Sequence, residues 1–178
     1  MIVHFRDEKD RLEAEQTASL VKEKGVEAEL VVADLSDTNQ IRSMFDHATT
    51  RFGRLDVLLN TVGMIIKKPF VEITETDYDT IFAINARSVF FSMQEAAKRM
   101  SDGGRIVNIG TSILGMSTAN YSIYAGSKAP IEHFTRALAK EVSDWDRPCK
   151  STRLLTTYYL ALAGGTMPFM RRYSTIWP

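Results

Sequence analysis

Short runs of apolar, β-branched residues alternate along the chain with longer segments whose apolar residues recur every three or four positions. The short runs predict strands at residues 2–5, 29–33, 55–59 and 105–109. The longer segments predict helices over residues 7–24, 36–52, 74–100 and 121–142. Strands that are each followed by a helix form a parallel sheet, and the largely apolar run at 55–59 is interpreted as a strand buried on both faces. The pattern therefore predicts a doubly wound α/β domain.

Local signals place the ends of three of these helices. Gly25 and Gly53 follow the last periodic residues, where a left-handed residue commonly ends a helix. Ser36 is a candidate N-cap for the second helix, because its hydroxyl can accept a hydrogen bond from a free backbone N–H. Thr74 and Asp77 have the spacing of a capping pair at the start of the third helix.

Composition narrows the class of protein. The 178 residues carry 22 basic and 22 acidic side chains, a balance that argues against binding to nucleic acid or to an anionic membrane surface. The single cysteine, Cys149, cannot form an internal disulfide, and the three histidines lack metal-ligand spacing. No apolar run reaches the 18 or so residues of a membrane span, and the start of the chain does not resemble a signal peptide. We expect a cytoplasmic protein without a metal.

Polar residues follow each predicted strand directly. Arg6 follows the first, Asp34 the second, and the segment 60–63 the third. Thr111 and Ser112 follow the fourth. The carboxyl ends of parallel strands meet at one edge of the sheet, where open α/β domains bind their ligands. We expect these residues to lie around a common site.

Tyr124 and Lys128 share one face of the last predicted helix, because residues four apart lie one turn from each other. An ammonium beside a phenol favours the phenolate, lowers the phenol pKa and suits it to proton transfer. By chance the spacing occurs about 0.3 times in a chain of this composition, so alone it is a weak signal.

The order of the motifs makes the signal specific. The chain contains, in this order, the segment 60–63 after a strand, Asn85 in the next helix, the stretch 104–112 and the stretch 124–136. Together these features resemble the short-chain dehydrogenase/reductase family. The resemblance covers about residues 1–143, and it implies a Rossmann-type, doubly wound parallel sheet with flanking helices. It also implies hydride transfer between a nicotinamide cofactor and a small-molecule alcohol or carbonyl compound.

The resemblance assigns four catalytic residues. Tyr124 matches the general acid and base, and Lys128 matches the residue that lowers its pKa and binds the nicotinamide ribose. Ser112 matches the hydroxyl that orients the substrate oxygen. Asn85 matches the helix residue that holds a water in the proton relay. Thr111 is a rival for the hydroxyl, but the pattern from Ser112 to the following glycine fits the family better.

The resemblance also implies cofactor contacts. Asp34, with Leu35 beside it, is similar to the acidic position that contacts the adenine amino group, although an aspartate there can simply favour a helix N-terminus. Asn60 and Gly63 match the turn against the adenosine ribose. Arg6 is placed to bind a 2′-phosphate, which favours NADP over NAD, and its neighbour Asp7 weakens that preference.

Two departures from the family pattern leave two hypotheses open. Residues 1–143 lack the usual first strand and its Gly-rich turn, so the neighbouring strands are expected to carry unpaired backbone groups. Residues 144–178 form a divergent tail, in which neither residues 164–165 nor 167–168 replaces the family's Pro-Gly turn. One hypothesis is an NAD(P)-dependent oxidoreductase. The other is a catalytically incompetent, truncated remnant that acts as an oligomerisation or interaction module or is a gene-model fragment. The family expectation is a homo-dimer or homo-tetramer through the two long helices.

Overall fold

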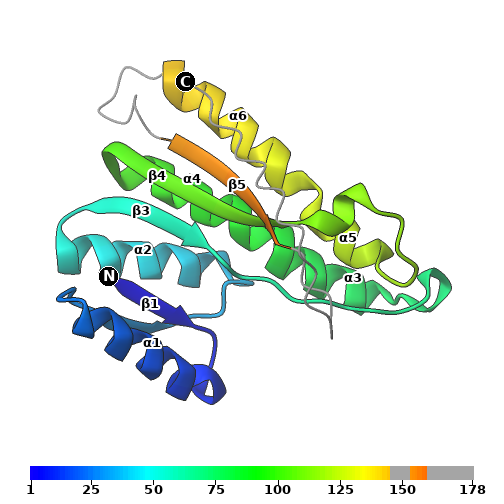
Figure 1. Ribbon diagram of the computed structural model, residues 1–178, viewed down its shortest axis with the longest axis horizontal. Helices are drawn as coiled ribbons and strands as arrows, with labels where there is room; N and C mark the ends of the chain where they lie inside the picture. Colours follow the sequence, from blue (N-terminus) through cyan, green and yellow to red (C-terminus); the bar gives the residue numbers. More distant parts are fainter. Residues whose placement is uncertain (145–152, 160–178) are drawn as a thin grey trace.

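The computed structural model describes residues 1–144 and 153–159. Five parallel strands and six α-helices follow one another along these residues (Figure 1). The strands are β1 (Ile2–Phe5), β2 (Glu29–Val32), β3 (Leu55–Asn60), β4 (Met100–Thr111) and β5 (Arg153–Tyr159). The helices are α1 (Arg11–Glu23), α2 (Thr38–Phe52), α3 (Glu75–Phe82), α4 (Ser88–Arg99), α5 (Ser122–Lys128) and α6 (Pro130–Asp144). The prediction of a Rossmann-type parallel α/β fold is confirmed.

The strands form two separate sheets within the described residues. β1 pairs with β2, and β3, β4 and β5 pair in that order, all in parallel. The register aligns Asn60 with Asn108 at the carboxyl end of β3. β1 and β3 run in the same direction on either side of an interval in which no hydrogen bond joins them (Figure 1). β1 and β3 therefore each have one edge without a hydrogen-bonded strand among the described residues.

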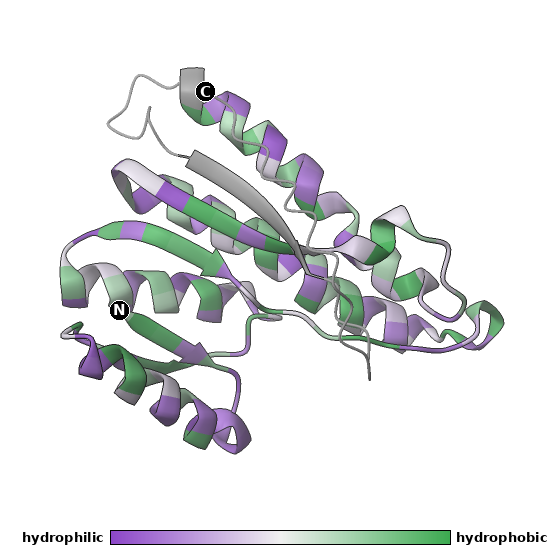
Figure 2. Ribbon diagram, viewed as in Figure 1, coloured by the Kyte–Doolittle hydropathy of each residue, from purple (hydrophilic) through white to green (hydrophobic). Residues whose placement is uncertain are grey.

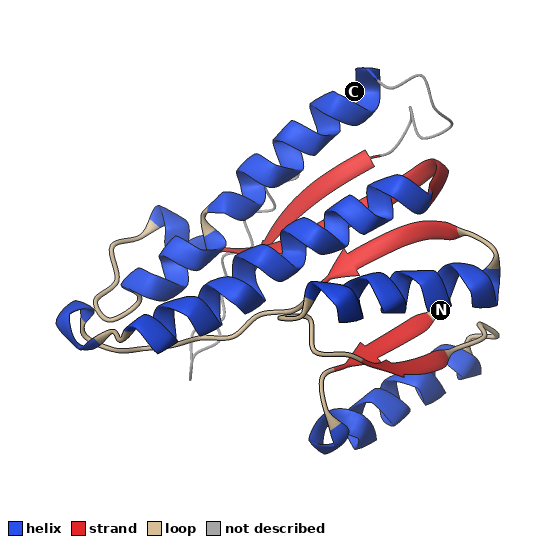
Figure 3. Cartoon of the chain, turned by 180° about the vertical axis from the view of Figure 1, so that it is seen from behind, coloured by secondary structure: helices blue, strands red, loops and turns tan. Residues whose placement is uncertain are grey.

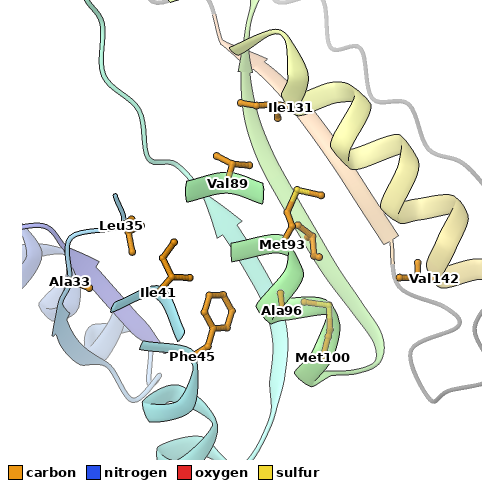
Figure 4. Close-up of a cluster of buried hydrophobic side chains, with 11 residues drawn as sticks. Ala33, Leu35, Ile41, Phe45, Val89, Met93, Ala96, Met100, Ile131 and Val142 are labelled. Carbon is orange, nitrogen blue, oxygen red and sulfur yellow. The ribbon is translucent and has the colours of Figure 1, made fainter. Parts of the chain in front are cut away.

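Helices α2, α4 and α6 cover one face of the strands, as the view from behind shows (Figure 3). Figure 2 shows apolar residues concentrated on the strands, while the helices alternate between apolar and polar residues. The main core lies between these layers and joins α2, α4 and α6 (Figure 4). Ile41, Ile106 and Ile131 are almost completely buried there. A second cluster packs α1 against β1 through Val3, Phe5 and two alanines. These two cores hold the carboxyl ends of the strands in place.

Both long helices predicted from the sequence are interrupted. The predicted helix over 74–100 divides into α3 and α4 around a π-helical turn, Ala83–Arg87. The predicted helix over 121–142 divides into α5 and α6 at Ala129, because Pro130 has no N–H to continue the helical hydrogen bonds of α5. Periodicity alone does not reveal the π turn, since the apolar stripe continues through it. Both interruptions lie beside the candidate site.

Three further details of the sequence prediction are wrong. The N-cap of α2 is Asp37, whose carboxylate accepts from the Asn39 N–H, and not Ser36. β3 is not buried on both faces, since the side chains of Val57 and Leu59 are more than half exposed. No described element covers that face of β3. β4 begins at Met100 rather than at residue 105.

Other local predictions are confirmed. Gly25 and Gly53 have positive φ angles of 76° and 74°, the left-handed conformation that ends their helices. Thr74 and Asp77 form a complete capping box at the start of α3. The tail contributes β5, while residues 145–152 and 160–178, which include Cys149 and the segments 164–165 and 167–168, lie outside the described residues. Within the described ranges no helix is long and apolar enough to cross a membrane.

Candidate active site

The side chain of Asn85 fastens the loop after β3 to the helices. It lies in the π-helical turn and is completely buried. Its Oδ1 accepts from the Met64 backbone N–H at 2.8 Å, and its Nδ2 donates to the Met64 carbonyl at 2.9 Å. The Nδ2 also donates to the Ser127 hydroxyl at 2.9 Å. Both N–H bonds of the amide are therefore used by the protein, so this side chain positions its neighbours rather than facing a ligand.

Lys128 extends from the end of α5 into the same region, and 4% of its surface is exposed. Its Nζ donates to the carbonyls of Val62, at 3.2 Å, and Ile109, at 3.4 Å. Burial in this low-dielectric site disfavours the charged form and lowers the pKa of Lys128 from 10.5 to about 8. The ammonium is thus held between the carboxyl ends of β3 and β4.

Gly63 makes room for that ammonium. A Cβ atom at this position would lie 2.8 Å from Lys128 Nζ and 3.4 Å from Asn85 Oδ1. The first distance is shorter than real Cβ contacts, so a side chain here would push the lysine away. The structure therefore brings Gly63, Asn85 and Lys128 together, three residues that are far apart in the sequence.

Tyr124 lies on α5 one turn before Lys128 and is 9% exposed. Its ring packs in an apolar cluster with Ile81, Ile113 and Ile123. The Tyr121 ring meets it edge to face, with 6.2 Å between the ring centroids. This packing restricts the ring to one orientation, a requirement for a group that transfers a proton.

The two candidate hydroxyls after β4 have different environments. Thr111 caps a short 3-10 helix, and its hydroxyl accepts from the Ile113 N–H at 3.4 Å. Ser112 Oγ is buried and has no hydrogen-bond partner within the described part of the chain. A buried hydroxyl without a partner costs free energy unless a ligand or water completes its bonds. Of the two hydroxyls, Ser112 is therefore the one whose hydrogen bonds the described residues leave incomplete.

Arg6 and Asp34 border a cavity of about 940 Å³ that also contacts Ser36, Arg87 and the π-helical turn. The pKa of Asp34 is lowered, mainly because its carboxylate accepts a hydrogen bond from the Ser36 backbone N–H. The positive charge of Arg6 lowers this pKa further. Arg6 is exposed and pairs with Asp7 at 3.3 Å. The structure thus brings the two predicted cofactor residues to one cavity, with opposite charges on its wall.

Leu35 and Asn60 occupy different surroundings from the other predicted cofactor residues. The Leu35 side chain is 6% exposed and belongs to the main core. The Asn60 amide donates to Asn108 Oδ1 at 2.7 Å, and the Asn108 amide donates to the Thr135 hydroxyl at 2.8 Å. The Asn60, Asn108 and Thr135 side chains thus join β3, β4 and α6, while the Leu35 side chain packs in the core.

Two residues at this site, Ser127 and Arg87, were not predicted from the sequence. Ser127 contacts Asn85 and the backbone of α5. Arg87 donates to the Ser36 carbonyl at 2.6 Å and lines the cavity of Arg6 and Asp34. Arg87 follows Asn85 by two positions, and a cation so close to a candidate site residue was a usable signal. Ser127 gave none, because a serine inside a helix is ordinary.

Comparisons with known proteins identify the class of protein. A family model described as enoyl-(acyl carrier protein) reductase matches residues 1–146. The chain belongs to the short-chain dehydrogenase/reductase family. This agrees with the resemblance seen in the ordered motifs of the sequence.

Among its relatives are two curated proteins and one solved structure. The hydroxynaphthalene reductase-like protein Arp2 of Metarhizium brunneum is 37% identical over 127 residues, which are 71% of this chain and 48% of that protein. Elsinochrome reductase 1 of Elsinoe fawcettii is 34% identical, over 81% of this chain and 54% of that protein. A putative dehydrogenase from Burkholderia cenocepacia with bound NADP is 40% identical with a TM-score of 0.83, and the match covers 88% of this chain and 57% of that one. The chain thus spans about half the length of the curated relatives it matches.

Proposed function

We propose that this protein is an NADP-dependent oxidoreductase that interconverts a carbonyl compound and the corresponding alcohol. The observation that carries the proposal is the position of Tyr124 and Lys128 on α5, with the ammonium held between the ends of two strands. The relatives named as reductases and the Burkholderia structure with bound NADP support the same function.

The described residues fit the two ends of a nicotinamide dinucleotide. At one end, Arg6 offers a cation for a 2′-phosphate and Asp34 an acceptor for an adenine amino group. At the other end, the missing side chain of Gly63 leaves space beside Lys128, and Ser112 has an unsatisfied hydroxyl. The Gly-rich turn that binds the pyrophosphate in this family has no counterpart in residues 1–6. When bound, the cofactor supplies or accepts the hydride.

The protein's own residues would manage the proton and the orientation of the substrate. In the direction of reduction, the Tyr124 hydroxyl donates its proton to the carbonyl oxygen, and in oxidation the phenolate accepts the alcohol proton. The Lys128 ammonium, one helical turn away, stabilises the phenolate. Ser112 donates a hydrogen bond that holds the substrate oxygen beside Tyr124. Burial of the cluster around Tyr124 excludes water and strengthens these interactions.

The test is the substitution Tyr124→Phe, with Tyr121→Phe as the matched control. Both changes remove one phenol oxygen from neighbouring rings, but only Tyr124 lies within α5, one turn before Lys128, whereas Tyr121 precedes the helix as its N-cap. With NADPH and a panel of aromatic ketones and quinones, oxidation of the cofactor is expected to fall at least about 100-fold in Tyr124→Phe. Tyr121→Phe should keep activity within a few-fold of the wild type. Equal activity in Tyr124→Phe and the wild type would reject the assignment.

We propose further that the protein forms a homo-dimer or homo-tetramer through α4 and α6. A groove of about 370 Å³ between these helices is lined by Phe90, Met93, Phe134 and Leu138, and Phe90 is 41% exposed. Burial of such a surface against a second copy is favourable, at roughly 25 cal/mol per Å² of apolar area. Sedimentation equilibrium tests this proposal, and a monomer at all concentrations would contradict it.

A second candidate function is that of an interaction module without catalysis. The observation that favours it is the exposed apolar face of β3 at Val57 and Leu59. Calorimetry separates the two functions. An oxidoreductase releases or absorbs heat on titration with NADPH, whereas an interaction module shows none and is recovered in a complex with a full-length relative.

A further inference from the structure

Ser127 has a place in the site that the four family residues do not account for. Its side chain is completely buried on α5. The hydroxyl donates to the Tyr124 carbonyl at 2.8 Å and accepts from Asn85 Nδ2 at 2.9 Å. One oxygen atom therefore joins the helix that carries Tyr124 and Lys128 to the π-helical turn that carries Asn85.

The contacts continue from Asn85 until they return to α5. Asn85 binds the backbone N–H and carbonyl of Met64, which fixes the loop after β3. Two residues earlier in that loop, the Val62 carbonyl accepts from Lys128 Nζ. Lys128 is the next residue after Ser127, so the contacts form a closed ring. The ring passes through α5, the π-helical turn and the loop, and its members are all nearly buried or belong to the backbone.

We propose that Ser127 is a positioning residue that closes this ring and thereby fixes the Lys128 ammonium against the loop after β3. The proposal deepens the proposed function, on which it rests, because it explains how the proton-transferring pair keeps its geometry. Ser127 acts through Asn85 and Lys128 and does not itself touch the substrate or the cofactor.

Loss of the hydroxyl has a specific consequence. In Ser127→Ala, one N–H of the buried Asn85 amide loses its acceptor, and an unsatisfied buried donor is costly. The amide can recover a partner only by turning, which releases Met64 and the loop. The Val62 carbonyl then moves away from Lys128, and water reaches the ammonium. Since burial is what holds the pKa of Lys128 at about 8, hydration raises the pKa toward 10.5.

Ser88 provides a matched control. It is 1% exposed, lies on a neighbouring helix, and its hydroxyl donates to a carbonyl of the preceding helical turn, that of Ile84. Ser127 makes the same kind of bond to Tyr124, but only Ser127 also accepts from Asn85. Replacing either serine by alanine removes one buried hydroxyl, so a difference between the two variants reports the bond to Asn85.

The experiment measures the pKa of Lys128 by NMR of protein labelled at lysine Cε, with the signal assigned by its loss in Lys128→Arg. In Ser127→Ala the pKa is expected to rise by about one pH unit, equivalent to a tenfold change in the ionisation constant. Ser88→Ala should leave it unchanged, and Ser127→Thr, which keeps the hydroxyl, should restore it. If Ser127→Ala does not fold, Ser127→Cys and Ser88→Cys are compared in its place.

An unchanged pKa in Ser127→Ala, or the same change in Ser88→Ala, would overturn the inference. This measurement requires no turnover, so it tests the ring of contacts even if the wild type is inactive and the proposed function fails. With an active wild type, Ser127→Ala should lower kcat about tenfold with little change in KM for the cofactor. A rise in KM with unchanged kcat would show that Ser127 supports binding instead, which contradicts the proposal.

Discussion

Replacing Lys128 by methionine is expected to stabilise the protein at neutral pH while it removes catalysis. The ammonium is 4% exposed, and burial lowers its pKa to about 8. In the unfolded chain the same group titrates near 10.5. Folding therefore disfavours the charged lysine, and an apolar side chain of similar length avoids that cost.

The magnitude follows from the two pKa values. The interval between about 8 and 10.5 is about 2.5 pH units, which corresponds to roughly 3 kcal/mol when Lys128 is fully charged. Against this, the carbonyls of Val62 and Ile109 lose their donor, at a cost of about 1 kcal/mol for the pair. We expect Lys128→Met to raise the free energy of unfolding by roughly 1–2 kcal/mol at pH 7.

The predicted difference in stability between Lys128→Met and the wild type depends on pH. Between about pH 8 and 10.5 the unfolded chain binds more protons at this position than the folded chain, so the stability of the wild type rises with pH there. The advantage of Lys128→Met should accordingly shrink over that interval. Urea denaturation at a series of pH values measures it, with exposed Lys22→Met as the control. A variant that is less stable than the wild type at pH 7, or an advantage that does not change with pH, would refute the reasoning.

The remaining predictions concern a close approach and a buried ion pair. Gly63→Ala should displace the Lys128 ammonium and lower the reductase activity about tenfold, because the new Cβ would lie 2.8 Å from Nζ. Gly115→Ala is the control. A Cβ there meets no atom within 4 Å, so this variant should behave as the wild type in the same assay. Glu95 is 2% exposed and binds Lys98 and Arg99, so Glu95→Gln should lower the free energy of unfolding by about 2 kcal/mol in urea denaturation. A loss under about 0.5 kcal/mol would show that the Lys98 and Arg99 cations find other partners or water without cost.

Periodicity predicted the order of strands and helices because each apolar run packs into one of the buried clusters. The 3.6-residue pattern of α2 and the apolar run of β3 are strong signals of this kind. Periodicity did not predict that Val57 and Leu59 are exposed, since the burial of a strand depends on which elements cover its faces. It also missed the π-helical turn at Ala83–Arg87, where one extra residue per turn leaves the apolar stripe nearly intact.

The sequence predicted that Tyr124 and Lys128 lie one turn apart on the same helix, and both belong to α5 in the structure. The candidate site was not predictable where the role of a side chain depends on distant partners. Asn60 matches a cofactor motif, but its amide binds Asn108, 48 positions away. Leu35 lies beside Asp34 in the sequence, but its side chain belongs to the core. Tertiary contacts decide these cases, and no local pattern records them.

Titration of the protein with NADPH and with NADH by calorimetry tests the central claim most directly. If the site of Arg6, Asp34, Gly63 and Lys128 holds a dinucleotide, NADPH gives a saturable heat with one equivalent per chain, and NADH binds more weakly because it lacks the 2′-phosphate for Arg6. The absence of heat with both cofactors, from protein shown to be folded by its urea transition, would contradict the account.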